Sequence, residues 1–147
     1  MATPRTLKIG SGASHEPASC QELRRLGDLH EKGYIVSAPL MEHAPFDSVA
    51  YKNGSCKTIQ VKYRSTREDR GTMTVHFRSS YSDSNGLHTQ KVDKGGIDVY
   101  SIYCPNTDSC YYLSPDEFGE TVSLRVEPPE NNQTENINFA SDYLEVP

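Results

Sequence analysis

The chain has no tryptophan, only four phenylalanines and only four cysteines among its 147 residues. Its hydrophobic content of 35% is low for a globular protein, which predicts a small core and long loops. No apolar run approaches the roughly 18 residues that a membrane-spanning helix needs. The first 17 residues also lack the apolar middle of a signal peptide. We therefore expect a cytoplasmic protein that does not enter a membrane.

The four cysteines include no Cys-x-x-Cys pair and have no histidines at a partnering distance, so they do not predict a zinc site. Cys104 and Cys110 flank a turn and could lie opposite each other. In a reducing compartment we expect two free thiols there rather than a disulfide.

The net charge of −5 argues against a protein that coats DNA by bulk electrostatic attraction. The charge is unevenly distributed, however. The stretch from Lys57 to Arg78 carries six of the fifteen basic residues, whereas the acidic excess lies toward the C-terminus. This asymmetry is compatible with one DNA-binding face on an otherwise acidic protein.

The length is that of one ordinary domain. We expect a flexible tail over residues 1–15 and a single domain over residues 16–147. The sequence patterns then predict a series of elements: a helix over Ser19–Lys32, strands over Tyr34–Ala38, Phe46–Tyr51, Cys56–Tyr63 and Thr72–Ser79, a long loop over Ser80–Gly96, a hairpin over Ile97–Leu113, a short helix started by Ser114 and Pro115, a strand over Thr121–Val126 and a short closing helix over Asn138–Leu144.

Glu22 has an unusual position in the first helix. The apolar stripe expected to face the core consists of Leu23, Leu26 and Leu29, and on a helical wheel Glu22 falls between the last two. A buried carboxylate is costly unless it is paired or binds something. Alternatively, Ser19 and Glu22 form a capping box that closes the first turn. The residues alone leave both interpretations open.

Asn53 and Gly54 separate two segments of alternating polarity, which is the strongest short-range signal for a two-residue β-hairpin turn. Such a turn places Lys52 opposite Ser55, and therefore Asp47 opposite Gln60. Directly opposed residues project from the same face of a sheet, and Lys62 shares this face because it lies two residues further along the strand. We therefore expect Asp47, Gln60 and Lys62 to cluster.

This cluster suits the hydrolysis of a phosphodiester. The side-chain oxygens of Asp47, Gln60 and Glu22, together with the backbone carbonyl of Val61, can hold a Mg²⁺ ion that keeps several waters. The ion would activate one of these waters and screen the charge that builds on the phosphate. Lys62 would orient or deprotonate the water, or stabilise the transition state as a fixed cation.

These residues also carry a family resemblance. The run Glu22…Gly33-Tyr34-Ile35-Val36…Pro45-Phe46-Asp47…Ile59-Gln60-Val61-Lys62 resembles the PD-(D/E)XK nuclease superfamily, and within it the group I intron-associated homing endonucleases. The resemblance covers about residues 19–143. It departs from the wider superfamily at Gln60, where a carboxylate is usual, and in the acidic character of the chain.

The resemblance implies an α/β (α+β) fold with a restriction-endonuclease-like αβββαβ core, a mixed central sheet with flanking helices and an extra C-terminal hairpin or arm. It also implies that Glu22, Asp47, Gln60 and Lys62 are the catalytic residues. The implied activity is sequence-specific cleavage of both strands of double-stranded DNA by an oligomer with two active sites. Repair, restriction and junction resolution remain alternatives on the same fold, as does a catalytically silent DNA-binding or assembly module.

Two further predictions concern partners. We expect DNA contacts from the basic residues that follow the site, namely Arg64, Arg67, Arg70, Arg78, Lys91 and Lys94. The Ile97–Leu113 hairpin carries more aromatic residues than one small core is expected to absorb, which favours an interface in a homodimer or homotetramer. The alternative is that its tyrosines cover the central sheet of one chain.

Overall fold

A computed structural model describes residues 18–147 except residues 42, 69, 92–95, 129 and 132–134. The expected tail over residues 1–15 and Lys94 lie outside the described residues. The described part contains a five-stranded mixed sheet in which β3 and β7 are parallel and the other neighbours are antiparallel. In spatial order the strands are β1 (Ile35–Ser37), β2 (Ser48–Lys52), β3 (Ser55–Tyr63), β7 (Val99–Cys104) and β8 (Ser109–Leu113).

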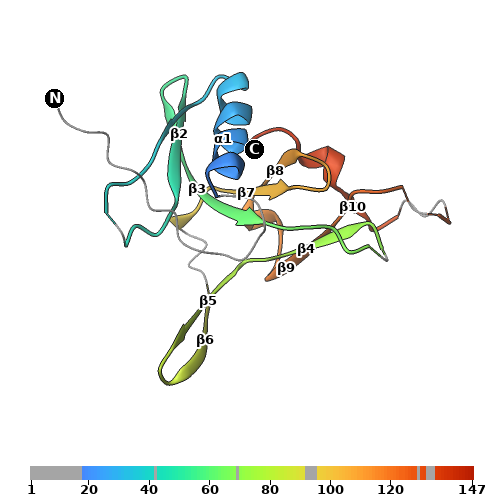
Figure 1. The fold of residues 1–147 in the computed structure, drawn as a ribbon. Coiled ribbons are helices and arrows are strands. Elements are labelled where there is room, and N and C mark those ends of the chain that lie inside the picture. The colour runs from blue at the N-terminus through green and yellow to red at the C-terminus, as the bar shows by residue number, and fades with distance from the viewer. Residues whose placement is uncertain (1–17, 42, 69, 92–95, 129, 132–134) are drawn as a thin grey trace.

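One face of this sheet is covered by the helix α1 (Ala18–Glu31), as Figure 1 shows. Leu29 is fully buried there against residues of β2, β3, β7 and β8. The expected apolar stripe is wrong at Leu23, which is 67% exposed. The side chains buried along α1 are instead Gln21, Arg25 and Leu29, whose spacing of four residues places them on one side of the helix. This face of the helix is therefore partly polar.

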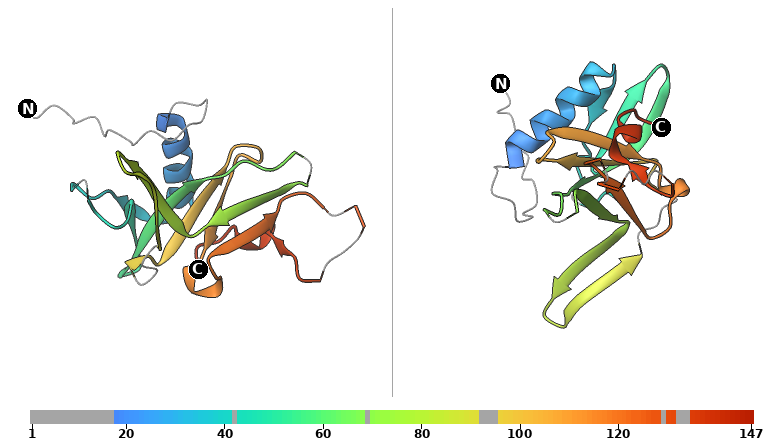
Figure 2. Two further views of the ribbon diagram at one scale, coloured as in Figure 1. Left: turned by 90° about the horizontal axis from the view of Figure 1, so that it is seen from below. Right: turned by 90° about the vertical axis from the view of Figure 1, so that its right-hand side faces the viewer.

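A second, three-stranded sheet packs on the opposite face of the central sheet (Figure 2). Its strands, in spatial order, are β10 (Asn138–Phe139), β9 (Thr121–Arg125) and β4 (Thr72–His76). Two 3₁₀ helices complete this side, η2 (Pro115–Glu117) and η3 (Ala140–Tyr143). As expected, Ser114 and Pro115 start η2, although the Ser114 side chain makes no capping hydrogen bond to it. The core between the sheets includes Met73, Ile102 and Leu124, each fully buried.

The tyrosines of the Ile97–Leu113 hairpin are buried in two cores, one between the two sheets and one under α1. Tyr100 and Tyr111 lie in the core between the sheets, and Tyr103 and Tyr112 lie in the core under α1. None of the four is more than 5% exposed. The expected surplus of aromatic surface on this hairpin is therefore wrong, because its tyrosines cover the central sheet of one chain. The exposed large hydrophobic side chains of the described residues lie elsewhere, at Leu23, Ile35, Leu40, Met41, Tyr51 and Leu144.

The fold class is confirmed, but the connection between β3 and β7 differs from an αβββαβ order. Its described residues contain β4 followed by a hairpin of β5 (Arg78–Asp83) and β6 (Gly86–Lys91), and no α-helix. The hairpin projects from the body of the molecule in Figures 1 and 2. The long loop expected over Ser80–Gly96 is therefore wrong for most of its length. No helix in the described part of the chain is long and apolar enough to cross a membrane.

Candidate active site

The β2–β3 hairpin has the register that its turn predicts. Asn53 and Gly54 both adopt positive φ angles, 51° and 82°, as a type I′ turn requires. The pairing then runs from Lys52 opposite Ser55 to Ser48 opposite Ile59. The backbone N–H of Asp47 continues the ladder by donating to the Ile59 carbonyl at 2.9 Å. Asp47 therefore lies immediately before β2, beside the middle of β3.

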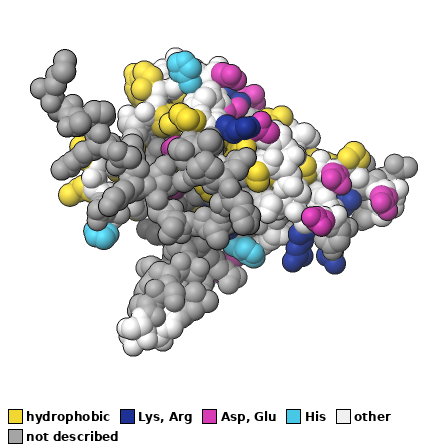
Figure 3. Space-filling view, viewed as in Figure 1, with side chains coloured by type: hydrophobic (Ala, Val, Ile, Leu, Met, Phe, Trp, Pro, Cys, Tyr) yellow, Lys and Arg dark blue, Asp and Glu magenta, His cyan; other side chains and the backbone are white. Residues whose placement is uncertain are grey.

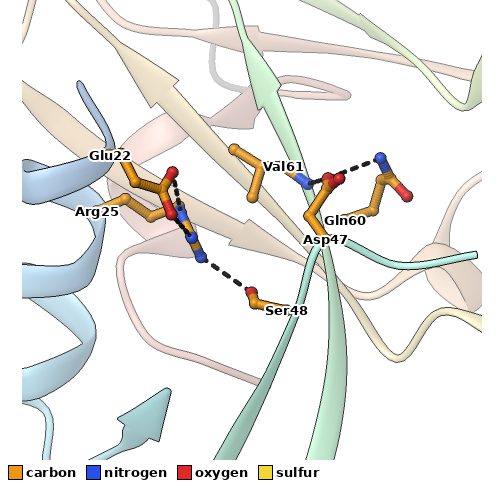
Figure 4. Close-up of polar contacts among 6 residues, drawn as sticks. All are labelled: Glu22, Arg25, Asp47, Ser48, Gln60 and Val61. Carbon is orange, nitrogen blue, oxygen red and sulfur yellow. Dashed lines mark hydrogen bonds and ion pairs between the residues drawn. The ribbon is translucent and has the colours of Figure 1, made fainter. Parts of the chain in front are cut away.

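The Asp47 carboxylate is held by two groups of β3 (Figure 4). Its Oδ2 atom accepts a hydrogen bond from the backbone N–H of Val61 at 2.7 Å and another from the Gln60 side-chain amide at 2.8 Å. β2 begins only at Ser48. The Val61 N–H, which has no partner in β2, is therefore bonded by the Asp47 carboxylate. The sequence-based prediction that Asp47 and Gln60 meet is confirmed. The site is open, because the Asp47 side chain is exposed.

Lys62 lies beside this pair and is half-buried. Burial lowers the pKa of Lys62, the neighbouring Arg64 lowers it further, and the Asp47 carboxylate acts in the opposite direction. Lys62 lies two residues beyond Gln60 on β3, so it shares a face of the sheet with the amide that binds Asp47. The Lys62 Nζ atom also lies 5.7 Å from the centre of the Tyr100 ring, within the range of a cation–π interaction. A cation therefore lies on the sheet face that carries the exposed carboxylate, over the Tyr100 ring.

Glu22 is engaged differently. Its carboxylate forms a two-pronged ion pair with Arg25, whose Nε atom donates to Glu22 Oε2 at 3.3 Å. The Arg25 guanidinium also donates to the Ser48 hydroxyl at 3.1 Å. α1 has no acidic residue in its first turn, so Glu22 does not cap the helix. Glu22 is thus linked through Arg25 to Ser48, the residue that follows Asp47, but it does not contact Asp47 itself (Figure 4).

Arg25 is the residue that sequence reasoning missed. It is only 2% exposed and is among the largest fully buried side chains of the described protein. A buried arginine surrounded by surface charges has no distinctive sequence signal, although its spacing of four from Leu29 would have placed it on the core side. Tyr63 is close to the same group: burial raises the pKa of Tyr63, Glu22 raises it further, Arg25 opposes this, and Asp47 adds a smaller upward effect.

The donor set at the edge of β3 fits a hard cation. Among the described residues no three His, Cys, Asp or Glu side chains gather closely enough to hold a metal, so a cation here would need amide and carbonyl oxygens beside the Asp47 carboxylate. Gln60 carries such an amide. The N–H and C=O groups of one strand residue point to the same side, so the Val61 carbonyl faces the side where its N–H meets Asp47. Oxygen ligands of these kinds suit Mg²⁺.

The basic residues expected to contact DNA are spread over two segments. Arg64 is half-buried and donates to the Tyr63 carbonyl at 2.6 Å, whereas Arg67 and Arg70 are exposed in the loop between β3 and β4. Figure 3 shows Lys and Arg side chains, with Asp and Glu among them, at the end of the molecule where this loop lies. In the β5–β6 hairpin, the backbone register pairs Arg78 with Lys91.

A mixed sheet with a helix on one face is the arrangement of a restriction-endonuclease-like fold. Here the sheet carries an Asp–Gln–Lys cluster at the open end of a β-hairpin, with Gln60 where a carboxylate is usual. Residues 14–146 match the family model described as PD-(D/E)XK endonuclease, and the chain belongs to this family. The fold is similar to the solved structure of a bacterial homing endonuclease, I-Ssp6803I, with a TM-score of 0.68 and 18% sequence identity over 85% of this chain and 84% of that chain. No curated protein matches the chain in sequence.

Proposed function

We propose that the protein is a Mg²⁺-dependent, sequence-specific endonuclease that makes double-strand breaks in DNA as an intron-encoded homing enzyme. The observation that carries the proposal is the Asp47 carboxylate, exposed at the start of β2 and bound to Gln60 and to the Val61 N–H, with Lys62 beside it. Membership of the PD-(D/E)XK endonuclease family supports the nuclease part. The similarity to a homing endonuclease structure motivates the biological role.

In this mechanism Asp47, the Gln60 amide oxygen and the Val61 carbonyl hold the cation, with Glu22 as an additional acid near the site. When bound, Mg²⁺ lowers the pKa of its water and stabilises negative charge on the phosphate. Val61 and Gln60 keep the Asp47 carboxylate in one orientation before DNA binds. Lys62 contributes a fixed positive charge where charge develops in the transition state, an effect that does not require the enzyme to reorganise.

The test is cleavage of a randomised plasmid library in Mg²⁺, followed by sequencing of the ends. A homing enzyme is expected to linearise a small subset of plasmids that share one long target sequence. Short duplexes carrying this target, labelled on either strand, should then be cut on both strands. Cleavage without sequence preference, or of branched DNA alone, would contradict the homing role and support one of the other nuclease functions.

The second candidate is a non-catalytic DNA-binding or assembly module. It is favoured because both acidic groups already have protein partners: the Asp47 carboxylate is bonded to Gln60 and Val61, and Glu22 is paired with Arg25. A neutral amide at position 60 also supplies less charge for a cation than the usual carboxylate. Retention of DNA by a protein that never cuts it in Mg²⁺ or Mn²⁺ would favour this candidate.

Gln60→Glu is expected to raise the affinity for Mg²⁺. The Gln60 amide nitrogen lies 2.8 Å from Asp47 Oδ2, so a glutamate there would bring a second carboxylate close to the first, and a cation would relieve their repulsion. The variant should also unfold at a lower temperature than wild type in EDTA and regain stability as Mg²⁺ is added. Calorimetric Mg²⁺ titrations of both proteins check this. An unchanged or weaker midpoint would contradict the assignment of Gln60 as a ligand.

A quadruple variant with alanine in place of Arg64, Arg67, Arg70 and Arg78 is expected to bind DNA more weakly than wild type. Each arginine that contacts only a phosphate should lower affinity for all sequences and reduce the salt slope by about one unit, whereas one that reads a base should cost roughly 1–3 kcal/mol and relax a single position. Fluorescence anisotropy at several salt concentrations measures both effects. Lys52→Ala, a cation at the hairpin tip held by the Lys32 carbonyl, is the control. Unchanged affinity in the quadruple variant would place the DNA face elsewhere.

A double-strand break at one target is expected to require at least a dimer. Each 147-residue chain supplies one Asp47–Lys62 cluster, and two such clusters must be related by a two-fold axis to cut both strands. Because the tyrosines of the Ile97–Leu113 hairpin are buried, they no longer support this expectation. A homotetramer meets the same two-fold requirement as a dimer. Sedimentation velocity at micromolar concentration, with and without DNA, measures the state. A monomer in both conditions would contradict stable assembly.

A further inference from the structure

Tyr100 lies directly beside the proposed site although sequence reasoning gave it no role there. β3 and β7 are parallel, and their register pairs Gln60 with Tyr100 and Lys62 with Ile102. Tyr100 therefore lies next to the strand segment that carries the amide and the lysine, on the sheet face that packs against β4 and β9. Its side chain is completely buried.

The ring of Tyr100 is in contact range of the Lys62 ammonium group. The Nζ atom lies 5.7 Å from the ring centre, and the face of a tyrosine ring attracts a cation at this distance, more strongly when water is excluded. Lys62 is half-buried, so part of its hydration is replaced by this ring. A flexible lysine side chain is thereby held on the Asp47 side of the sheet.

Tyr100 is itself rigidly placed. The Phe77 ring packs against it with centroids 4.7 Å apart and planes at 62°, and the backbone N–H of Phe77 is fixed by the Glu120 carbonyl at 2.9 Å. The Tyr100 hydroxyl is buried and has no hydrogen-bond partner among the residues that the structure describes. In the structure, therefore, the contribution of Tyr100 to the site comes from its ring and not from its hydroxyl.

We propose that Tyr100 is a positioning residue for the nuclease reaction: its ring holds the Lys62 ammonium beside Asp47 and Gln60, ready for the charge that forms on the phosphate. The proposal rests on the proposed function as far as catalysis is concerned. The placement of Lys62 against the ring is a structural statement and can be measured without any cleavage.

The experiment compares Tyr100→Met, which removes the ring but fills the space with a flexible apolar side chain, with the conservative variant Tyr100→Phe. Tyr111→Met is the matched control, because Tyr111 is a tyrosine of the same core that is 5% exposed. In single-turnover cleavage, Tyr100→Met should lower the rate about tenfold with DNA affinity within about twofold. Tyr100→Phe should restore the rate, and Tyr111→Met should keep it.

The readout independent of activity is NMR of protein labelled at its lysines. In wild type and Tyr100→Phe the Lys62 ε-methylene protons should be shifted by the ring current of residue 100, and in Tyr100→Met this shift should disappear. An unshifted Lys62 signal in wild type would overturn the proposal even if the methionine variant failed to fold. Equal losses of rate in Tyr100→Met and Tyr111→Met, or in Tyr100→Phe and Tyr100→Met, would also overturn it. A shifted signal in a protein that does not cut DNA would instead count against the proposed function.

Discussion

Asp47→Asn and Lys62→Ala are each expected to lower the single-turnover cleavage rate by about 100- to 1000-fold, the loss typical of removing one group that stabilises transition-state charge. Asparagine keeps an oxygen that can accept the Val61 N–H bond, and Asp47 is exposed, so the fold should survive. DNA affinity, measured by anisotropy with Ca²⁺ in place of Mg²⁺, should change little, because both residues act on the scissile phosphate.

Asp98 provides a matched control for Asp47. It is also exposed, and its carboxylate also accepts a hydrogen bond from a backbone N–H of β3, that of Thr58, at 2.8 Å. Its partner Thr58 lies three residues before Val61 on β3, and Asp98 is not among the proposed site residues. Asp98→Asn should therefore cut at the wild-type rate. Near-normal cleavage by Asp47→Asn or Lys62→Ala, or an equal loss in Asp98→Asn, would remove the assignment of the site.

Arg25→Ala is expected to destabilise the protein by about 1–3 kcal/mol, the range for removing one partner of a buried polar contact, because the Glu22 carboxylate left behind is 29% exposed and keeps part of its hydration. Arg25 is 2% exposed, and its removal leaves the Glu22 carboxylate and the Ser48 hydroxyl without their guanidinium partner beneath α1. For a chain of this length the midpoint of thermal unfolding should fall by roughly 2–12 °C. Arg25→Lys should not restore it, because an ammonium group cannot reproduce the forked contact.

The comparison for Arg25 is Arg24→Ala. Arg24 is the preceding residue of α1, and it pairs with Asp108 at the surface, where its side chain is 48% exposed. Surface ion pairs of this kind contribute little to stability. Thermal unfolding followed by circular dichroism, at equal protein concentration, distinguishes the two arginines. Equal midpoints for the two variants would show that the buried ion pair does not stabilise the fold.

The part of the site that could be predicted from the sequence is the part fixed by local geometry. Asn53-Gly54 determines a turn type, the turn determines the register of β2 and β3, and the register brings Asp47 to Gln60. No contact distant in the sequence is needed for this step. The catalytic roles of Asp47, Gln60, Lys62 and Glu22 stay predictions, because the position of a group does not measure its chemistry.

The features that could not be predicted depend on tertiary packing. Leu23 has the apolar side chain of a core residue, but the side of α1 that packs on the sheet is the one that carries Arg25, so Leu23 is exposed. The tyrosines of β7 and β8 look like surplus until a second sheet and a helix cover both faces. The β5–β6 hairpin is a different case. Asn85-Gly86 is the same dipeptide as Asn53-Gly54, but here Gly86 already pairs with Asp83, so the two turn residues are Ser84 and Asn85. Its flanking residues are mostly polar, so no apolar alternation identified them as strands.

The central claim is that the Asp47–Gln60–Lys62 cluster is a metal-dependent phosphodiester hydrolysis site. Its most direct test is one plasmid-cleavage measurement on EDTA-dialysed wild type and EDTA-dialysed Asp47→Asn, each with and without added Mg²⁺, on a library that contains the target. Linear product should form only in wild type with Mg²⁺. Cleavage by wild type in EDTA, equal cleavage by both proteins, or intact plasmid in all four reactions would contradict the claim.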